Sequence, residues 1–116
     1  MLIGINTYLH VRPLAGCVND CDAMKAWLEK SFDDVHQVLL TNDQATRANI
    51  LTEIQNLAND HRIQENDPVL IFFAGHGAEV KPLKEWNLPS KRKLQMLIPY
   101  DFKYTSEYFF VLSALC

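Results

Sequence analysis

An unbroken apolar run, Val69-Leu70-Ile71-Phe72-Phe73-Ala74, carries the clearest structural signal in this chain. The run is entered through Asn66-Asp67-Pro68 and left through Gly75. A short apolar run without polar alternation is typical of a strand that is covered on both faces, as in a parallel sheet. Three further apolar runs predict three more strands, at residues 2–6, 38–40 and 94–98.

Two amphipathic segments separate the first three runs. The first has apolar residues at spacings of four, three, four and four: Cys17, Cys21, Met24, Leu28 and Phe32. The second has a similar face preceded by Thr46 as a helix N-cap: Ile50, Leu51, Ile54, Leu57 and Ala58. Both patterns predict helices with one buried face. The order strand, helix, strand, helix, strand predicts an α/β sheet with right-handed crossovers.

Composition narrows the class of protein. A length of 116 residues, with 48% hydrophobic and 22% charged residues, is that of one small globular domain. The net charge of −3 gives no electrostatic reason to expect nucleic-acid binding. No apolar run approaches the ~20 residues of a membrane helix, and the start of the chain lacks a basic signal-peptide region. Three cysteines exclude a closed disulfide framework, which predicts a reducing, cytoplasmic setting.

His76 is the residue most suited to chemistry. Ligands of open α/β sheets bind beyond the carboxyl ends of the strands, and Gly75-His76-Gly77 follows the central apolar run directly. Flanking glycines allow a sharp turn that exposes the imidazole, which is a natural general base near neutral pH. The other histidines have polar or irregular neighbours and are interpreted as surface residues: His10, His36 and His61.

The turn between the first strand and first helix, residues 14–20, should lie at the same edge of the sheet. Asp20 could pair there with a basic group of a ligand. Capping of the helix by Asn19 or Asp20 is the alternative, which local physics alone favours. Gly16 is the only glycine of this turn, so a glycine-rich phosphate loop is lacking. The hypothesis of a small domain that binds a phosphate-bearing ligand is therefore weak.

Four segments together resemble the caspase-like cysteine peptidases, and most closely the metacaspases and related caspase-domain proteins. They follow one another in the family's order between residues 2 and 103: 14–20, 45–50, 72–77 and 97–101. The resemblance implies an α/β, caspase-like three-layer sandwich with a mainly parallel sheet, incomplete at its C-terminal side. It also implies a cysteine-type endopeptidase that acts in proteolysis and programmed cell death.

The resemblance assigns roles to individual residues. His76 matches the catalytic histidine, the general base that activates a cysteine thiolate for attack on a scissile carbonyl. Gly77 matches backbone near the oxyanion site. Asp20 matches an acid in the pocket for a substrate Arg or Lys, so cleavage of peptides or proteins after basic residues is expected. Calcium activation is common among metacaspases, but the residues expected to bind calcium lie beyond this chain, which leaves calcium dependence open. No cofactor is predicted within the chain, and a metal site made of Cys17, Cys21 and His76 is a weak hypothesis because these residues lack ligand-motif spacing.

No residue of the sequence fits the nucleophile. The caspase pattern has ~50 residues between histidine and cysteine, whereas forty residues follow His76 here. Cys116 is the last of them, so nothing follows it to form an oxyanion hole, and the terminal carboxylate disfavours its thiolate. Cys17 and Cys21 lie on the apolar face of the first helix and are interpreted as inert core thiols. The chain alone is therefore expected to be inactive.

The sequence predicts a partial peptidase domain over residues 1–103 and a divergent apolar tail over 104–116, from an interrupted gene or a natural fragment. The basic segment 81–93 predicts an exposed loop. An alternative function is a non-catalytic pseudo-peptidase that pairs with caspase-like chains through an exposed sheet edge. Neither reading predicts a nucleic-acid or membrane partner.

Overall fold

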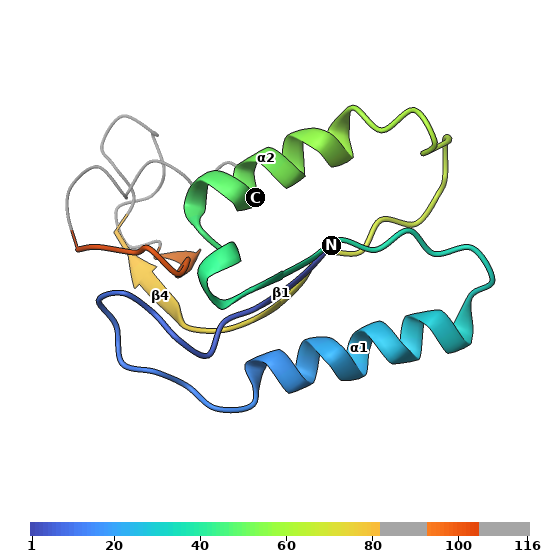
Figure 1. Cartoon of the computed structure of the whole chain (residues 1–116). Helices are drawn as coiled ribbons and strands as arrows, with labels where there is room; N and C mark the ends of the chain where they lie inside the picture. The colour runs from blue at the N-terminus through green and yellow to red at the C-terminus, as the bar shows by residue number, and fades with distance from the viewer. Residues whose placement is uncertain (82–92, 105–116) are drawn as a thin grey trace.

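A computed structural model describes residues 1–81 and 93–104, in which two helices enclose a small parallel sheet (Figure 1). The central elements are β1 (Leu2–Gly4), α1 (Cys17–Ser31), β2 (Leu39–Thr41), the 3-10 helix η1 (Asn42–Gln44), α2 (Arg47–Ala58) and β3 (Phe72–Ala74). A hairpin follows, made of β4 (Gly77–Val80) and β5 (Leu94–Leu97). None of the helices in the described ranges is long and apolar enough to cross a membrane.

The sheet has the strand order β2-β1-β3, and all its pairs are parallel. Ile3 of β1 lies opposite Leu40 of β2 on one side and opposite Phe73 of β3 on the other. The chain therefore crosses from β1 to β2 through α1, and returns past β1 to β3 through α2. Right-handed crossovers in opposite directions put α1 and α2 on opposite faces of the sheet, as Figure 1 shows. The expected three-layer α/β sandwich is confirmed.

The core has two halves because successive strand side chains point to opposite faces. On the α1 face, Leu2 packs with Cys21 and Leu28. The α2 face holds the larger buried cluster: Ile3, Ile5, Leu40, Ala45 and Ile50. Thr46 caps α2 as expected, since its hydroxyl accepts a hydrogen bond from the N–H of Asn49 at 3.2 Å.

Gly4 sets how closely α1 approaches the sheet. A Cβ atom at this position would lie 2.7 Å from Sγ of Cys21 and 2.8 Å from the carbonyl oxygen of Cys17. Both distances are far below van der Waals contact, so the helix and the strand can pack at this separation only with glycine between them. Gly4 thereby fixes the start of α1 against the carboxyl end of β1.

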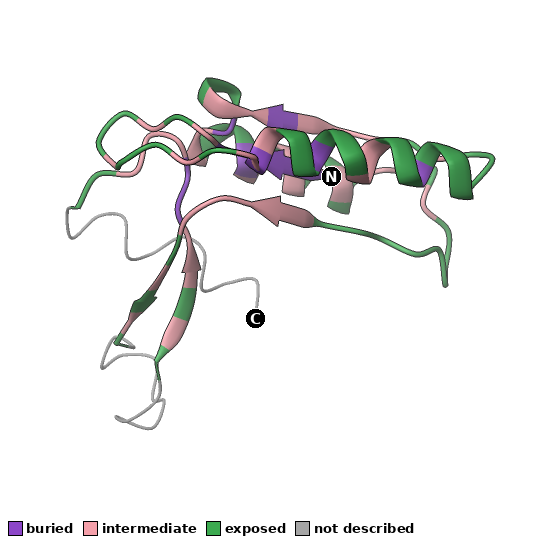
Figure 2. Cartoon of the chain, turned by 90° about the horizontal axis from the view of Figure 1, so that it is seen from below, coloured by how far each residue is buried: buried purple, intermediate pink, exposed green. Residues whose placement is uncertain are grey.

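The hairpin corrects the expectation of a fourth parallel strand. Residues 94–97 form β5, but β5 pairs antiparallel with β4 in a separate sheet that projects from the sandwich (Figure 2). β4 itself was not predicted. Its sequence, Gly-Ala-Glu-Val, is short, and its residues alternate between exposed and half-buried, so its strand conformation depends on pairing with β5.

Two further expectations were wrong in part. Phe32 lies beyond the end of α1 in an extended conformation and is half-exposed, with its ring edge-on to Trp27. Residues 69–71 precede β3 and are exposed, although the sequence predicted a strand covered on both faces. The predicted loop at 81–93 and tail at 104–116 lie largely outside the described residues.

Candidate active site

Three loops meet at the carboxyl edge of the sheet because β1, β2 and β3 are parallel. Asn42, directly after β2, joins two of them: its Oδ1 accepts hydrogen bonds from the backbone N–H groups of Asn6 (2.9 Å) and Thr7 (3.2 Å). Oδ1 of Asn6 in turn accepts a hydrogen bond from the N–H of Val18 in the first turn of α1, at 3.4 Å. The loop after β1, residues 5–16, is therefore fixed to β2 and to α1.

His76 lies between β3 and β4 and is held at three points. Its backbone N–H donates to the hydroxyl of Tyr8 at 2.8 Å, and its carbonyl oxygen accepts from the N–H of Ile98 at 2.9 Å. Nε2 of the imidazole lies 2.9 Å from the carbonyl oxygen of Arg12. The rings of Tyr8 and His76 also pack together, with centroids 5.1 Å apart.

The contact with Arg12 determines which ring nitrogen carries the proton. A carbonyl oxygen can only accept, so Nε2 of His76 must donate a hydrogen atom. In a neutral imidazole the other nitrogen, Nδ1, then keeps its lone pair. The site therefore presents Nδ1 of His76 as a proton acceptor.

The sequence also predicted roles for Asp20 and Gly77. Asp20 is exposed in the first turn of α1, where the helix dipole favours a carboxylate. The alternative that Asn19 or Asp20 caps the helix is wrong, because the N-cap is Gly16 and no side chain caps it. Gly77 is exposed at the start of β4. Within the described part of the chain, no hydrogen bond or ion pair joins the Asp20 carboxylate to His76.

The two cysteines of α1 are free and buried. Burial above all, together with the nearby carboxylates of Asp22 and Asp20, raises the pKa of Cys21 to about 11. Cys21 is therefore a thiol at neutral pH and a poor nucleophile. Cys17 is the first residue of α1, and Cys116 lies outside the described residues. Among residues 1–81 and 93–104, no group of three metal-ligating side chains could hold a metal ion.

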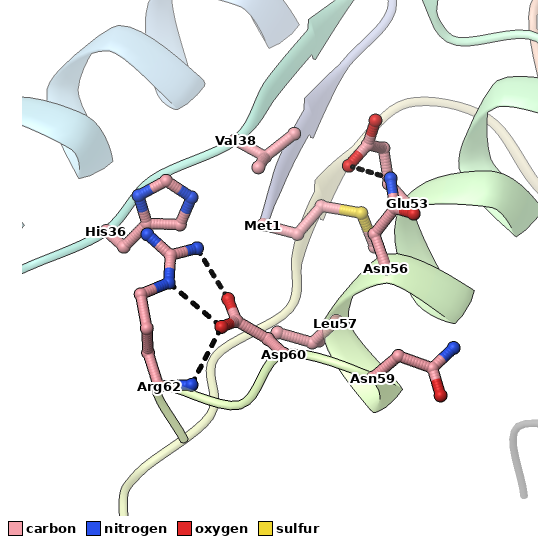
Figure 3. Close-up of a pocket in the computed structure, with 9 residues that line it drawn as sticks. All are labelled: Met1, His36, Val38, Glu53, Asn56, Leu57, Asn59, Asp60 and Arg62. Atoms are coloured by element: carbon pink, nitrogen blue, oxygen red, sulfur yellow. Dashed lines mark hydrogen bonds and ion pairs between the residues drawn. The ribbon is translucent and has the colours of Figure 1, made fainter.

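A separate pocket of about 410 Å³ opens at the opposite end of the sheet (Figure 3). Met1 and Val38, which line it, precede β1 and β2. Asp60 and Arg62 form an ion pair at 2.6 Å beside His36, and the hydrogen bonds from Arg62 hold the pKa of Asp60 well below its usual range. This pocket lies away from the edge that carries His76.

The sequence did not single out the residues that hold His76 and its loop. His76 is held by the hydroxyl of Tyr8 and the backbone carbonyl of Arg12. The loop that carries them is held by the side-chain amide oxygens of Asn6 and Asn42. One feature of the sequence could have pointed to Tyr8: it lies in the loop after the first predicted strand, at the edge of the sheet where His76 was also expected.

A family model for the caspase domain matches residues 1–111. The chain belongs to the caspase-domain family. Curated relatives of this caspase domain are metacaspases. Metacaspase-1 of Ajellomyces capsulatus is 36% identical over 91 residues, and Metacaspase-1 of Botryotinia fuckeliana is 38% identical over 93 residues. Each match covers 72% of this chain, but only 25% and 21% of the respective relative. No solved structure gave a significant match.

Proposed function

We propose that this caspase domain supplies the general base, and part of the substrate pocket, of a metacaspase-like cysteine endopeptidase. The observation that carries the proposal is the hydrogen bond between Nε2 of His76 and the Arg12 carbonyl, which leaves Nδ1 as the acceptor. Membership of the caspase-domain family supports the reaction class. The chain spans about a fifth to a quarter of the length of its curated relatives.

The reaction would use His76 twice. Nδ1 takes the proton of a cysteine thiol, and the sulfur attacks the scissile carbonyl carbon. As the tetrahedral intermediate collapses, the C–N bond breaks and the imidazolium returns the proton to the leaving amine. Water then hydrolyses the thioester with His76 again as base. The N–H of Gly77 is placed by this proposal near the developing oxyanion.

The nucleophile would come from outside the described residues. Cys21 is excluded by its raised pKa and burial, and Cys17 is buried at the start of α1. In the isolated 116-residue chain, Cys116 carries the terminal carboxylate, which disfavours its thiolate. With Cys17 and Cys21 also unsuited, we expect the isolated chain not to hydrolyse peptides. Its free thiols also fit a reducing, cytoplasmic setting.

Asp20 would determine specificity. Its carboxylate is exposed in the first turn of α1, at the end of the sheet where the loop of His76 also lies. A carboxylate pairs strongly with guanidinium or ammonium groups, so we expect cleavage after Arg or Lys. Asp20→Asn should raise KM for such substrates far more than it lowers kcat.

A chimera tests the proposal directly. Residues 1–104 of this chain would replace the matching segment of Metacaspase-1 from Ajellomyces capsulatus, and Arg- and Lys-terminated fluorogenic peptides would be the substrates. We expect hydrolysis that falls at least about 100-fold in His76→Ala. His61→Ala, at an exposed histidine away from the site, is the matched control and should retain activity. A folded chimera that is equally active with and without His76 would overturn the proposal.

The isolated 116-residue chain provides a second assay. It should release no fluorophore from the same peptides, and alkylation of its cysteines should proceed equally fast with His76 and with His76→Ala. Peptide hydrolysis that disappears in His76→Ala would show instead that one of its own cysteines is the nucleophile.

A second candidate function is a non-catalytic module that pairs through the outer edge of β3. No strand within the described ranges pairs with that edge, and the residues leading into it, Val69, Leu70 and Ile71, are 52%, 44% and 42% exposed. An open strand edge offers unpaired backbone groups to another chain. Co-purification with an intact metacaspase that is lost in Leu70→Lys, but kept in Trp27→Lys, would support it. A monodisperse monomer without such a partner would exclude it.

A further inference from the structure

The loop after β1 contacts His76 from two sides. Tyr8 contributes its hydroxyl to the backbone N–H and its ring to the imidazole, while Arg12 contributes its carbonyl to Nε2. One short loop thus controls both the backbone and the ring of the same residue. The only side chain among these contacts is that of Tyr8.

Tyr8 is itself held in place on both sides. The N–H of Thr7 donates to Oδ1 of Asn42 at 3.2 Å, and the N–H of Leu9 donates to the carbonyl oxygen of Tyr100 at 3.1 Å. The aromatic ring packs against the buried cluster on the α2 face. Burial also raises the pKa of Tyr8, so the phenol stays protonated and its oxygen is a neutral acceptor. The loop therefore presents the hydroxyl in a fixed position.

Gly75 leaves the space that the hydroxyl occupies. A Cβ atom at this position would lie 2.8 Å from the Tyr8 oxygen and 2.8 Å from Cζ of Phe73. Any other residue would push the phenol away from the N–H of His76. The hydrogen bond from His76 to Tyr8 therefore requires glycine at position 75.

We infer that Tyr8 is a positioning residue for the base: its hydroxyl and ring hold His76 so that Nε2 stays on the Arg12 carbonyl and Nδ1 faces the reacting thiol. This inference rests on the proposed function of His76. Displacement of a catalytic group by about 1 Å can cost on the order of 100-fold in rate, so loss of one holding contact should lower kcat. In this inference Tyr8 acts through His76 and not on the substrate, so KM should stay unchanged.

Tyr8→Phe tests the inference, because it removes the hydroxyl and keeps the ring. In the 116-residue chain, we expect faster hydrogen exchange of the His76 amide and ring 15N shifts of His76 that move toward those of the exposed His10. In the chimera, we expect kcat to fall about 10-fold with KM changed less than about twofold. Gly75→Ala should reproduce both effects, because it displaces the hydroxyl without removing it.

Tyr104→Phe is the matched control at a residue that is 86% exposed, and it should change none of these quantities. Unchanged kcat in Tyr8→Phe, despite faster amide exchange, would overturn the inference and leave Tyr8 a purely structural residue. If the chimera is inactive even with Tyr8 present, the proposed function fails instead. The ring 15N shifts then decide the positioning role alone, and unchanged shifts in Tyr8→Phe would refute it.

Discussion

The carbonyl oxygen of Arg12 and Nε2 of His76 lie 2.9 Å apart, although 64 residues separate them in the sequence. The contact uses the main chain of Arg12, while its side chain is exposed. The guanidinium is therefore not needed to hold the imidazole.

Arg12→Ala should accordingly leave peptide hydrolysis by the chimera within about twofold of the unchanged chimera, as is usual for exposed side chains away from a reacting group. Steady-state kinetics would measure this, with His76→Ala as the inactive reference. A large loss of kcat in Arg12→Ala would mean that the side chain, and not the carbonyl, contributes to the site.

Gly4→Ala should destabilise the fold. The new methyl group would meet Cys21 and the Cys17 carbonyl at less than 3 Å, and overpacking of this kind costs about 1–3 kcal/mol. Urea unfolding followed by circular dichroism would measure the loss. Gly77→Ala is the matched control, since its Cβ would lie 3.6 Å from the Met96 carbonyl, and its free energy of unfolding should change by less than about 0.5 kcal/mol. Equal stabilities of the two variants would contradict the close packing of α1 on β1.

Cys21 should make stability depend on alkaline pH. Its pKa is about 11 in the folded chain against a reference value of 9.0, so the folded state holds the thiol proton more tightly than the unfolded state. The resulting stabilisation is fully present below pH 9 and is lost as the pH rises from 9 to 11. The difference in unfolding free energy between the wild-type chain and Cys21→Ala should therefore shrink over this interval. A difference that stays constant from pH 7 to 11 would contradict the raised pKa.

Asn42 should contribute to stability through its side chain and its backbone. Asn42→Ala removes the acceptor for Asn6 and Thr7, at a cost of about 1–2 kcal/mol, and puts alanine at a positive φ of 46°. Asn42→Gly removes the same acceptor but tolerates the backbone angle, so it should be less destabilised than Asn42→Ala. If Asn42→Gly is as stable as the wild-type chain, the two side-chain hydrogen bonds contribute nothing.

Local patterns in the sequence were sufficient to predict the strands and helices of the central sandwich. The apolar runs predicted β1, β2 and β3, and the spacing from Cys17 to Leu28 predicted α1. Phe32 continued the helical spacing but lies outside the helix, because the chain becomes extended after Ser31. β4 had no local signal, since its conformation depends on pairing with β5.

The candidate site was predictable only at its centre. His76 lies between two glycines, directly after an apolar run, which is a local pattern. Its partners are 68 and 64 residues away in the sequence, and one of them acts through a backbone carbonyl, which residue identity does not reveal. Such contacts depend on the register of β1 against β3, which brings the two loops together only in the folded chain.

The protonation of the His76 ring tests the central claim most directly. The 15N chemical shifts of its two ring nitrogens would be measured in the 116-residue chain, at a pH at which the ring is neutral, with exposed His10 as the internal reference. We expect the proton on Nε2 and an unprotonated Nδ1. A ring protonated on Nδ1, or one that exchanges freely between both tautomers, would contradict the claim that this site presents Nδ1 of His76 as its base.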